Sequence, residues 1–334
     1  MEWFKITDPR KKIIITQVAN SLGLPPYAVE KDWWVTLALR ATFELPVSKH
    51  LVFKGGTSLS KAWTLIERFS EDIDLAIDRS FLGFEGELSK SQIDKLRKKA
   101  CQYVSTEFKE QLQNKLEEIG LNTKDFSLKE RKIIYTDTDP QVLELSYISL
   151  FEQNDYLSQR VLIEVGARSL REPAENRFLQ SFIGQNLNQS LFADKPFSVL
   201  VVNPQRTFIE KVLLLHEEFL KQDDKIKPNR MSRHLYDIHR MMDTDFGLKA
   251  VKNDDLFKTI VAHRIKYTPI RNIDYHFHTP NTLNIIPPQN SLSAWKQDYQ
   301  VMKANMIYGD APSFESLLKR MEELTVRFSQ MTLL

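Results

Sequence analysis

The spacing of apolar and polar positions predicts a helical start to this chain and then a region rich in strands. From about Ile13 to Thr42, apolar residues recur three and four positions apart, which is typical of a helix. The apolar run Leu51-Val52-Phe53 is ended by two glycines, so it predicts a short strand followed by a turn. Thr57 or Ser58 can cap the next helix, which is expected to run through Leu59, Ala62, Trp63 and Ile66.

The clearest alternation of apolar and polar residues lies between Phe69 and Ile77 and predicts a strand. Successive side chains of a strand point to opposite faces, so Ile73, Leu75 and Ile77 share one face. The opposite face carries Ser70, Asp72 and Asp74. A charged helix is expected next, around residues 95–99, and a second group of strands is expected at 132–135, 142–147 and 160–165.

From about Pro204 onward the spacing becomes helical. One apolar stripe contains Phe208, Val212, Leu215 and Phe219, and a second contains Leu235, Ile238 and Met242. The tail from Ser291 to Leu334 predicts one or two amphipathic helices. The pattern therefore predicts an α+β chain in which residues 1–200 form a mixed domain and residues 201–334 form a mostly helical domain.

The composition of the 334 residues is that of a globular protein, with 42% hydrophobic and 27% charged residues. No apolar run approaches the roughly 18 residues that a membrane-spanning helix needs, and residues 1–12 lack the apolar core of a signal peptide. Cys101 is the only cysteine, so no internal disulfide can form. We therefore expect a cytoplasmic protein with no membrane partner. Because the formal net charge is only +2, any polyanion would need a local basic patch.

The segment Lys54-Gly55-Gly56-Thr57-Ser58 has the features of a phosphate-binding turn. Two glycines after a strand allow a tight turn and a close approach of the backbone to a ligand. The helix that follows begins with free N–H groups, and the two hydroxyls add further hydrogen-bonding groups. An ordinary strand-to-helix turn would have the same sequence, so this segment alone does not decide between the two.

Asp72 and Asp74 place two carboxylates on one face of the predicted strand. Two like charges at this spacing favour a cation between them, and hard divalent cations prefer oxygen ligands. Glu164 is a candidate third carboxylate, because it interrupts an apolar strand at Val161 to Val165. The alternative is that this face of the strand is simply exposed to solvent. A phosphate turn and a metal-binding strand on neighbouring elements together favour a nucleotide-transfer site.

Ser70 shares the face of Asp72 in this pattern. Its hydroxyl could contact phosphate or be a modification point that blocks the site. It could equally be a polar residue at the entry of the strand.

The stretch Phe53 to Lys61, followed by Arg68 to Leu75, closely resembles the AbiEii/AbiGii-type nucleotidyltransferase toxin family. Segments 30–35, 206–211, 230–238 and 295–309 are also similar to the pattern of that family, so the resemblance spans nearly the whole chain. It implies a polymerase-β-like nucleotidyltransferase domain with a mixed sheet, followed by a helical domain. Members of the family are commonly toxins of toxin–antitoxin or phage-defence systems. They use a nucleoside triphosphate and Mg²⁺, and some transfer nucleotides to the 3′ end of tRNA.

The resemblance also implies roles for individual residues. Gly55, Gly56 and Thr57 match the phosphate turn of the family, and Asp72 and Asp74 match its metal ligands. Lys211 matches a lysine of the helical domain, and Asp237 matches a later acid, although Tyr236 stands where the family often has a lysine or arginine. The remaining candidates for nucleotide contact are Lys54, Ser58, Lys61, Arg68 and Ser70.

The residues of the second half allow two interpretations each. Lys211 borders an apolar helix stripe and could project toward a triphosphate, or it could lie on a solvated face. Asp237 lies four positions after Arg233 and three before Arg240, a spacing that predicts surface ion pairs. Residues 221–240 contain six Lys or Arg and three Asp, an excess that could follow an RNA backbone. Four aromatic residues could stack on bases or pack internally, namely Tyr267, Tyr275, His276 and His278.

These observations predict an enzyme that transfers a nucleoside monophosphate from a triphosphate to an acceptor hydroxyl. In this hypothesis Asp72 and Asp74 hold Mg²⁺, Glu164 assists, and Lys211 and Arg68 neutralise developing charge. The expected partners are a nucleoside triphosphate, an RNA acceptor such as tRNA, and a cognate antitoxin. The alternatives are a non-catalytic RNA- or partner-binding protein with the same fold, and nucleotide transfer to a protein or a small molecule.

Overall fold

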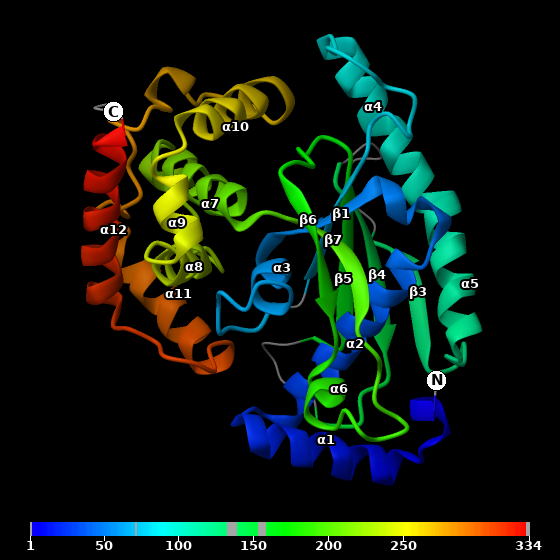
Figure 1. Cartoon of the computed structure of the whole chain (residues 1–334). Coiled ribbons are helices and arrows are strands. Elements are labelled where there is room, and N and C mark those ends of the chain that lie inside the picture. Colours follow the sequence, from blue (N-terminus) through cyan, green and yellow to red (C-terminus); the bar gives the residue numbers. More distant parts are fainter. Residues whose placement is uncertain (1, 71, 132–138, 153–157, 332–334) are drawn as a thin grey trace. The chain divides into compact units, whose positions relative to one another are not determined.

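The chain folds into two compact units (Figure 1). The computed structural model describes residues 2–70, 72–131, 139–152 and 158–331. Unit 1 comprises Met1–Ala62 and Phe69–Val202, and unit 2 comprises Trp63–Arg68 and Asn203–Leu334. The short segment Trp63–Arg68 therefore belongs with the second half of the chain, although it lies between elements of the first half.

Unit 1 is built on one seven-stranded mixed sheet with the strand order β3-β4-β5-β2-β1-β7-β6. The central strand β2 pairs antiparallel with β1 on one side and parallel with β5 on the other. The fold is therefore α+β, as expected. The strands are β1 (Leu51–Lys54), β2 (Asp72–Ile77), β3 (Phe126–Glu130), β4 (Gln141–Tyr147), β5 (Arg160–Gly166), β6 (Ala174–Leu179) and β7 (Phe197–Val202).

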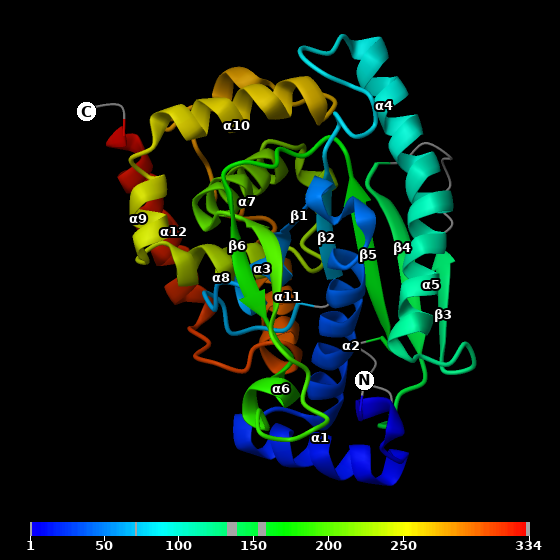
Figure 2. The same cartoon turned by 45° about the vertical axis from the view of Figure 1, so that its right-hand side comes forward.

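The helices of unit 1 cover this sheet, and α2 crosses it (Figure 2). Helix α2 contacts β2, β5 and β7 and also packs against α1, so nearly all of its side chains are buried. The helices are α1 (Asp8–Leu22), α2 (Pro26–Phe43), α3 (Gly55–Lys61), α4 (Lys90–Tyr103), α5 (Lys109–Ile119) and α6 (Phe182–Asn186). Shorter helical segments are η1 (Glu2–Lys5), η2 (Pro46–His50) and the π-helical η3 (Val104–Phe108), which joins α4 to α5.

Several element boundaries differ from those predicted by the spacing of apolar residues. The region from Ile13 to Thr42 is helical, as predicted, and consists of two helices, because Gly23 ends α1 in the left-handed conformation and prolines begin α2. Helix α3 ends at Lys61 instead of continuing to Ile66, and β2 begins at Asp72 instead of Phe69. Strands β3, β6 and β7 were not predicted. The strand expected at 132–135 lies outside the described residues.

Unit 2 is helical, and α7 lies at its centre. Helix α7 packs against α8, α9 and α10, and α8 packs in turn against α11 and α12. The predicted stripe of α7 is buried, and Phe208 packs with its ring 6.3 Å from that of Phe328 on α12. The helices are α7 (Pro204–Phe219), α8 (Ser232–Met241), α9 (Asp245–Ala250), α10 (Asp254–Tyr267), α11 (Leu292–Asn305) and α12 (Phe314–Ser329), with short turns η4 (Asp223–Lys225) and η5 (Tyr275–Phe277).

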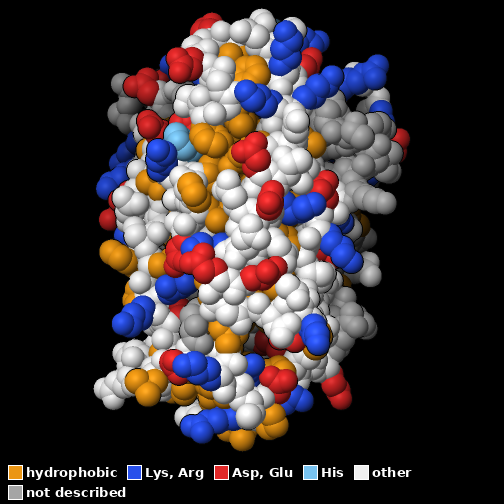
Figure 3. All heavy atoms as spheres, turned by 90° about the vertical axis from the view of Figure 1, so that its right-hand side faces the viewer, with side chains coloured by type: hydrophobic (Ala, Val, Ile, Leu, Met, Phe, Trp, Pro, Cys, Tyr) orange, Lys and Arg blue, Asp and Glu red, His pale blue; other side chains and the backbone are white. Residues whose placement is uncertain are grey.

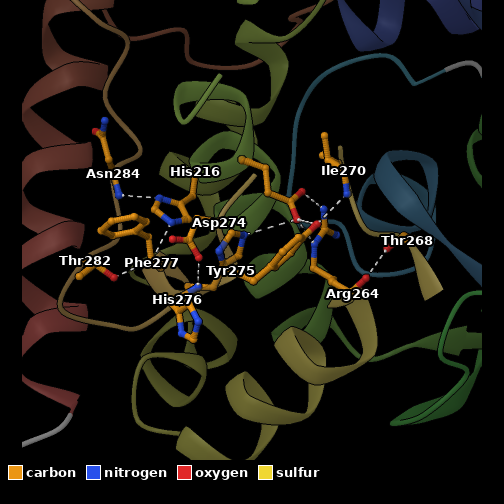
Figure 4. A network of polar contacts seen from close by, with 12 residues as sticks. His216, Arg264, Thr268, Ile270, Asp274, Tyr275, His276, Phe277, Thr282 and Asn284 are labelled. Carbon is orange, nitrogen blue, oxygen red and sulfur yellow. Dashed lines mark hydrogen bonds and ion pairs between the residues drawn. The ribbon is translucent and has the colours of Figure 1, made fainter. Parts of the chain in front are cut away.

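A buried polar network attaches the irregular segment after α10 to helix α7 (Figure 4). The Nδ1 atom of His216 accepts a hydrogen bond from the N–H group of Asn284 at 3.0 Å. The proton of the neutral ring therefore lies on Nε2, which donates to the carbonyl oxygen of Phe277 at 2.8 Å. Burial and the neighbouring ring of His278 lower the pKa of His216 to about 4, so this histidine is neutral at physiological pH.

The aromatic residues of this region that could have stacked on bases mostly pack against each other. Tyr275 stacks on the buried ring of His278 at 4.3 Å, and the buried Tyr267 stacks on His263 at 4.5 Å. His276 is the exposed member of the predicted group.

Among the helices of the described residues, none is both long enough and apolar enough to span a membrane.

Candidate active site

The predicted carboxylates lie at the centre of the sheet of unit 1. Strand β2 runs between β1 and β5 so that Asp74 is paired with Lys54 on one side and with Glu164 on the other. Register partners on neighbouring strands project to the same face of a sheet. Asp72, Asp74 and Glu164 are half-buried, whereas the residues that alternate with them are buried. The acidic face of β2 and β5 is therefore the accessible face, and the apolar face forms the core.

The glycine turn after β1 closely approaches the carboxylate of Asp74. Gly55 has a φ angle of +80°, which residues with a side chain rarely adopt. A Cβ atom at Gly55 would lie only 1.9 Å from the Oδ2 atom of Asp74. The turn and the acidic strand are thus in direct contact, and only glycine fits at this position. The glycine turn and the aspartates lie about 17 residues apart in the sequence. The antiparallel pairing of β1 with β2 brings them together into one local site.

The hydroxyls of the turn are used to fix helix α3 to its surroundings. Thr57 is buried and donates to the main-chain carbonyl oxygen of Asp72, which joins α3 to the first residue of β2. Ser58 is buried and donates to the carbonyl oxygen of Gly55 at 2.8 Å. No side chain forms a capping hydrogen bond with the first main-chain N–H groups of α3. Thr57 therefore joins α3 to β2, and the bond of Ser58 lies within α3, so the prediction that Thr57 or Ser58 caps this helix was wrong.

Lys61 at the end of α3 forms an ion pair with Asp32 of helix α2. Both side chains are almost completely buried, and the second oxygen of Asp32 accepts a hydrogen bond from the N–H group of Phe182 at 2.8 Å. The ammonium group of Lys61 also lies 5.3 Å from the centre of the Phe182 ring. Asp32 therefore ties α3, α2 and the start of α6 together. Asp32 was not among the predicted site residues, although an acid among the apolar residues of a predicted helix is a signal for a buried partner.

Arg68, Lys211 and Asp237 form a buried ionic cluster within unit 2. Two nitrogens of the Arg68 guanidinium lie 2.6 and 2.8 Å from the carboxylate oxygens of Asp237. The Nζ atom of Lys211 lies 2.8 Å from the same carboxylate and 3.4 Å from Nδ1 of His234. Burial by itself would raise the pKa of Asp237, but the two cations outweigh it and hold that pKa well below its usual value.

The surface ion pairs expected for Asp237 were therefore a wrong prediction. Asp237 is fully buried on α8, where helix spacing to Arg233 and Arg240 matters less than the inward direction of the side chain. Arg240 instead pairs with Glu67 at 2.9 Å. Tyr236, which replaces the basic residue common in the related pattern, is also fully buried.

The predicted site residues thus fall into two groups. In unit 1 the structure gathers the turn after β1 with the acids of β2 and β5, namely Lys54, Gly55, Gly56, Thr57, Ser58, Asp72, Asp74 and Glu164. In unit 2 it gathers Arg68, Lys211 and Asp237. Ser70 is half-buried and precedes β2 in an irregular segment. Lys61 lies at the far end of α3 from the glycine turn.

The donor set of the unit 1 site fits a divalent cation by its chemistry. Asp72 and Asp74 project from alternate positions of β2, and Glu164 is the register partner of Asp74 on β5. All three supply carboxylate oxygens, which hard cations such as Mg²⁺ prefer. Across the described ranges, no group of three or more His, Cys, Asp or Glu side chains is already gathered as a cluster that could hold a metal ion. Two carboxylates from one strand are the set expected for a cation that keeps water and substrate oxygens as further ligands.

Comparison with known proteins identifies the family. The family model described as "Nucleotidyl transferase AbiEii toxin, Type IV TA system" matches residues 38–320. Two solved structures are similar at low identity. MenT4, the nucleotidyltransferase toxin Rv2826c from Mycobacterium tuberculosis H37Rv, is 16% identical with a TM-score of 0.45, covering 95% of this chain and 98% of that chain. JHP933 from Helicobacter pylori is 16% identical with a TM-score of 0.36, covering 93% of this chain and 92% of that chain.

No curated protein matches this sequence. The assignment therefore rests on the family model, whose match includes the glycine turn, both aspartates of β2, Glu164 on β5 and the buried cluster of unit 2. Because that match covers most of the chain, this protein is a nucleotidyltransferase and belongs to the AbiEii toxin family of toxin–antitoxin systems.

Proposed function

We propose that the unit 1 site transfers a nucleoside monophosphate from a nucleoside triphosphate to an acceptor hydroxyl, with Mg²⁺ as the cofactor. The hydroxyl oxygen forms a bond to the α-phosphorus, the bond to the β-phosphate oxygen breaks, and pyrophosphate leaves. The observation that supports this proposal is the position of Asp74, between the backbone of Gly55 and its register partner Glu164. A phosphate-binding turn and metal-binding carboxylates must reach the same triphosphate for this chemistry, so their closeness here supports the proposal.

Each residue of the unit 1 site has a role in this proposal. Asp72 and Asp74 hold the cation, and a bound Mg²⁺ supplies positive charge to the triphosphate oxygens. Glu164 accepts the proton of the attacking hydroxyl or helps to position the cation. Gly55 and Gly56 let the backbone approach the phosphates, and Thr57 and Ser58 keep the turn in place through their main-chain hydrogen bonds. Lys54, next to Asp74 in the sheet register, adds a positive charge.

The roles proposed for Arg68, Lys211 and Asp237 are based on the family pattern. Arg68 is held within unit 2 by its two contacts with the carboxylate of Asp237. Lys211 is the candidate for neutralising charge during transfer. Asp237 orients both cations. Ser70, in the segment between Arg68 and β2, remains a candidate for phosphate contact or for modification.

We further propose that the acceptor is RNA, and that it is the 3′ end of tRNA. The family is one of toxins, so a cognate antitoxin is the expected protein partner. The basic excess in residues 221–240 supports an RNA acceptor only in part. Lys221 pairs with Glu218, and Arg240 pairs with Glu67, so these two cations already have acidic partners.

Label transfer tests this function directly. The purified protein is incubated with Mg²⁺, each α-labelled nucleoside triphosphate in turn, and total cellular RNA, beside an Asp72→Asn/Asp74→Asn variant. The proposal expects label in a discrete band of tRNA size, which is absent with the variant or with excess chelator. Label on the protein itself would move the acceptor to a side chain. Binding of triphosphate without any transfer would instead support a non-catalytic binding protein with the same fold.

A further inference from the structure

A cavity of about 110 Å³ lies in unit 1, between the N-terminal segment, helices α1 and α2, and the ends of β3 and β4. A single water molecule needs roughly 10–15 Å³ by the same measure, so the cavity has room for an organic group of several heavy atoms. None of the residues predicted to bind the nucleotide lines it. Figure 3 shows the face of the molecule on which α5 and the N-terminus lie, and near its lower end the surface is hollowed between acidic and hydrophobic side chains.

Aromatic rings form much of the wall of this cavity. Trp3, Phe4, Trp33 and Trp34 line it. The ring of Trp33 is at the centre, with ring centroids of Trp34, Trp3 and Phe4 at 5.2, 5.5 and 5.7 Å. Trp34 stacks on Tyr147 of β4, which holds this indole in place. Rigid aromatic rings around an open volume provide an apolar wall whose faces attract cations.

The ionisable groups of the cavity give it a negative balance. Its lining contains three carboxylates, those of Asp8, Glu30 and Asp125, and one ammonium group, that of Lys11. Lys11 lies 3.2 Å from Asp8, so this pair is neutral together. Among the lining residues, Glu30 and Asp125 are then two acids in excess over the cations. A ligand with phosphate groups would be repelled here, so the cavity is not an extension of the triphosphate site.

Glu30 is the buried acid of the two and is held in a fixed position. Its carboxylate accepts hydrogen bonds from the hydroxyl of Ser149 and from the N–H group of Leu150, the latter at 2.8 Å. Burial raises the pKa of Glu30, and its two hydrogen bonds and the charge of Lys12 offset this effect only in part. At the rim, Ile148 is 66% exposed and Asp125 is exposed as well. An apolar stem can therefore lie along the rim while a charged head reaches inward.

We propose that this cavity binds an alkylguanidinium group, with the planar cation between the indole rings and the carboxylate of Glu30. A guanidinium fits better than an ammonium because it is flat, stacks on aromatic faces and donates several hydrogen bonds from a rigid fork. The same group is found in free small molecules and in arginine side chains of a partner protein. The chemistry of the cavity is the same for both sources, and the experiment separates them.

Intrinsic tryptophan fluorescence is the direct measurement, because three tryptophans line the cavity. The full-length protein is titrated with butylguanidinium, and in parallel with butylurea, which has the same shape but no charge. Acetyl-Ala-Arg-Ala-amide serves as the peptide-borne form. We expect saturable quenching by the guanidinium compounds and binding of butylurea that is about tenfold weaker or absent. Stronger binding of the peptide would indicate a partner protein, and stronger binding of butylguanidinium would indicate a free small molecule.

Two variants make the test specific. Asp125→Asn and Glu30→Gln should each weaken butylguanidinium binding several-fold, and Asp125 is at the exposed rim, where loss of folding is not expected. Glu85→Gln is the matched control, since Glu85 is an exposed acid of unit 1 outside the cavity. Equal binding of butylguanidinium and butylurea would overturn the proposal. So would unchanged binding in both cavity variants, or the absence of any saturable quenching in a protein whose circular dichroism is native.

Discussion

The acids of β2 and the acid of α8 are both essential features of the predicted site, yet they are accommodated in opposite ways. Asp72 and Asp74 are half-buried on β2 beside the glycine turn, and Asp74 is the register partner of Lys54. Asp237 is fully buried and receives both Arg68 and Lys211. The carboxylates of β2 are partly accessible to solvent, whereas that of Asp237 is enclosed in fixed ion pairs. Acids of one family pattern can therefore lie in very different electrostatic surroundings.

The largest expected effect is on catalysis and comes from Asp74→Asn. Loss of one metal-binding carboxylate should lower the rate of nucleotide transfer by at least about a thousandfold, because charge stabilisation in the site depends on it. The free energy of unfolding should change by less than about 1 kcal/mol, because the side chain is half-buried on an accessible face. Label transfer and chemical denaturation measure the two quantities. Retention of transfer would show that Asp74 is not a metal ligand.

The opposite pattern is expected for Asp237→Asn, which should mainly affect stability. Removing this charge leaves Arg68 and Lys211 buried without their anion, which should cost about 3–5 kcal/mol of unfolding free energy. Asp243→Asn is the matched control in the same unit. Asp243 is 59% exposed and also meets two arginines, Arg320 and Arg327, so its loss should cost less than about 1 kcal/mol. Similar losses in both variants would contradict the contrast between enclosed and exposed acids.

Acidification should destabilise the closed interior of unit 2 through His216. The pKa of His216 is about 4 in the folded chain and about 6.5 in the unfolded chain, so the unfolded state takes up the proton first. The free energy of unfolding should therefore fall as the pH drops from about 6.5 to about 4. The expected loss is up to about 3 kcal/mol, because each unit of pKa difference corresponds to about 1.36 kcal/mol. Denaturation midpoints measured across this pH range provide the data.

His216→Gln supplies the reference for that pH series. A glutamine can accept and donate one hydrogen bond through its amide but does not titrate. The slope of stability against pH should therefore be smaller in the variant than in the unchanged protein between these pH values. Parallel slopes would mean that His216 is not the group responsible. The ring orientation and its two main-chain partners are visible in Figure 4.

The smallest expected effect concerns the contact between the glycine turn and Asp74. Gly55→Ala and Gly23→Ala both place a Cβ atom at a positive φ angle, but only the first meets another atom, Oδ2 of Asp74. Gly23→Ala should cost about 1 kcal/mol of stability from backbone strain and leave transfer unchanged. Gly55→Ala should cost about 2 kcal/mol more and also reduce transfer, because the carboxylate must move. Equal effects on stability and on transfer would show that the close contact has no part in the site.

Much of the candidate site was predictable from the sequence because its determinants are local. The alternation at residues 72–77 put both aspartates on one face, and the structure has the strand at these residues. Two glycines after an apolar run predicted a turn, and β1 does end there. The partners of the buried charged residues were not predictable in this way. Lys61 and Asp32 are 29 positions apart in the sequence, and Arg68 and Asp237 are 169 positions apart.

The sequence by itself determined the α+β class and the two faces of β2, because both depend on short-range spacing of residues along the chain. It also carried the motifs that resemble the AbiEii family. Only the tertiary structure decided that β2 lies between β1 and β5, which aligns Asp74 with Lys54 and Glu164. It alone decided that Trp63–Arg68 leaves α3 and joins unit 2, because the bond from Arg68 to Asp237 requires the helical unit to be folded. The physical reason is the same in each case, since burial and register arise from long-range packing that periodicity along a single segment cannot encode.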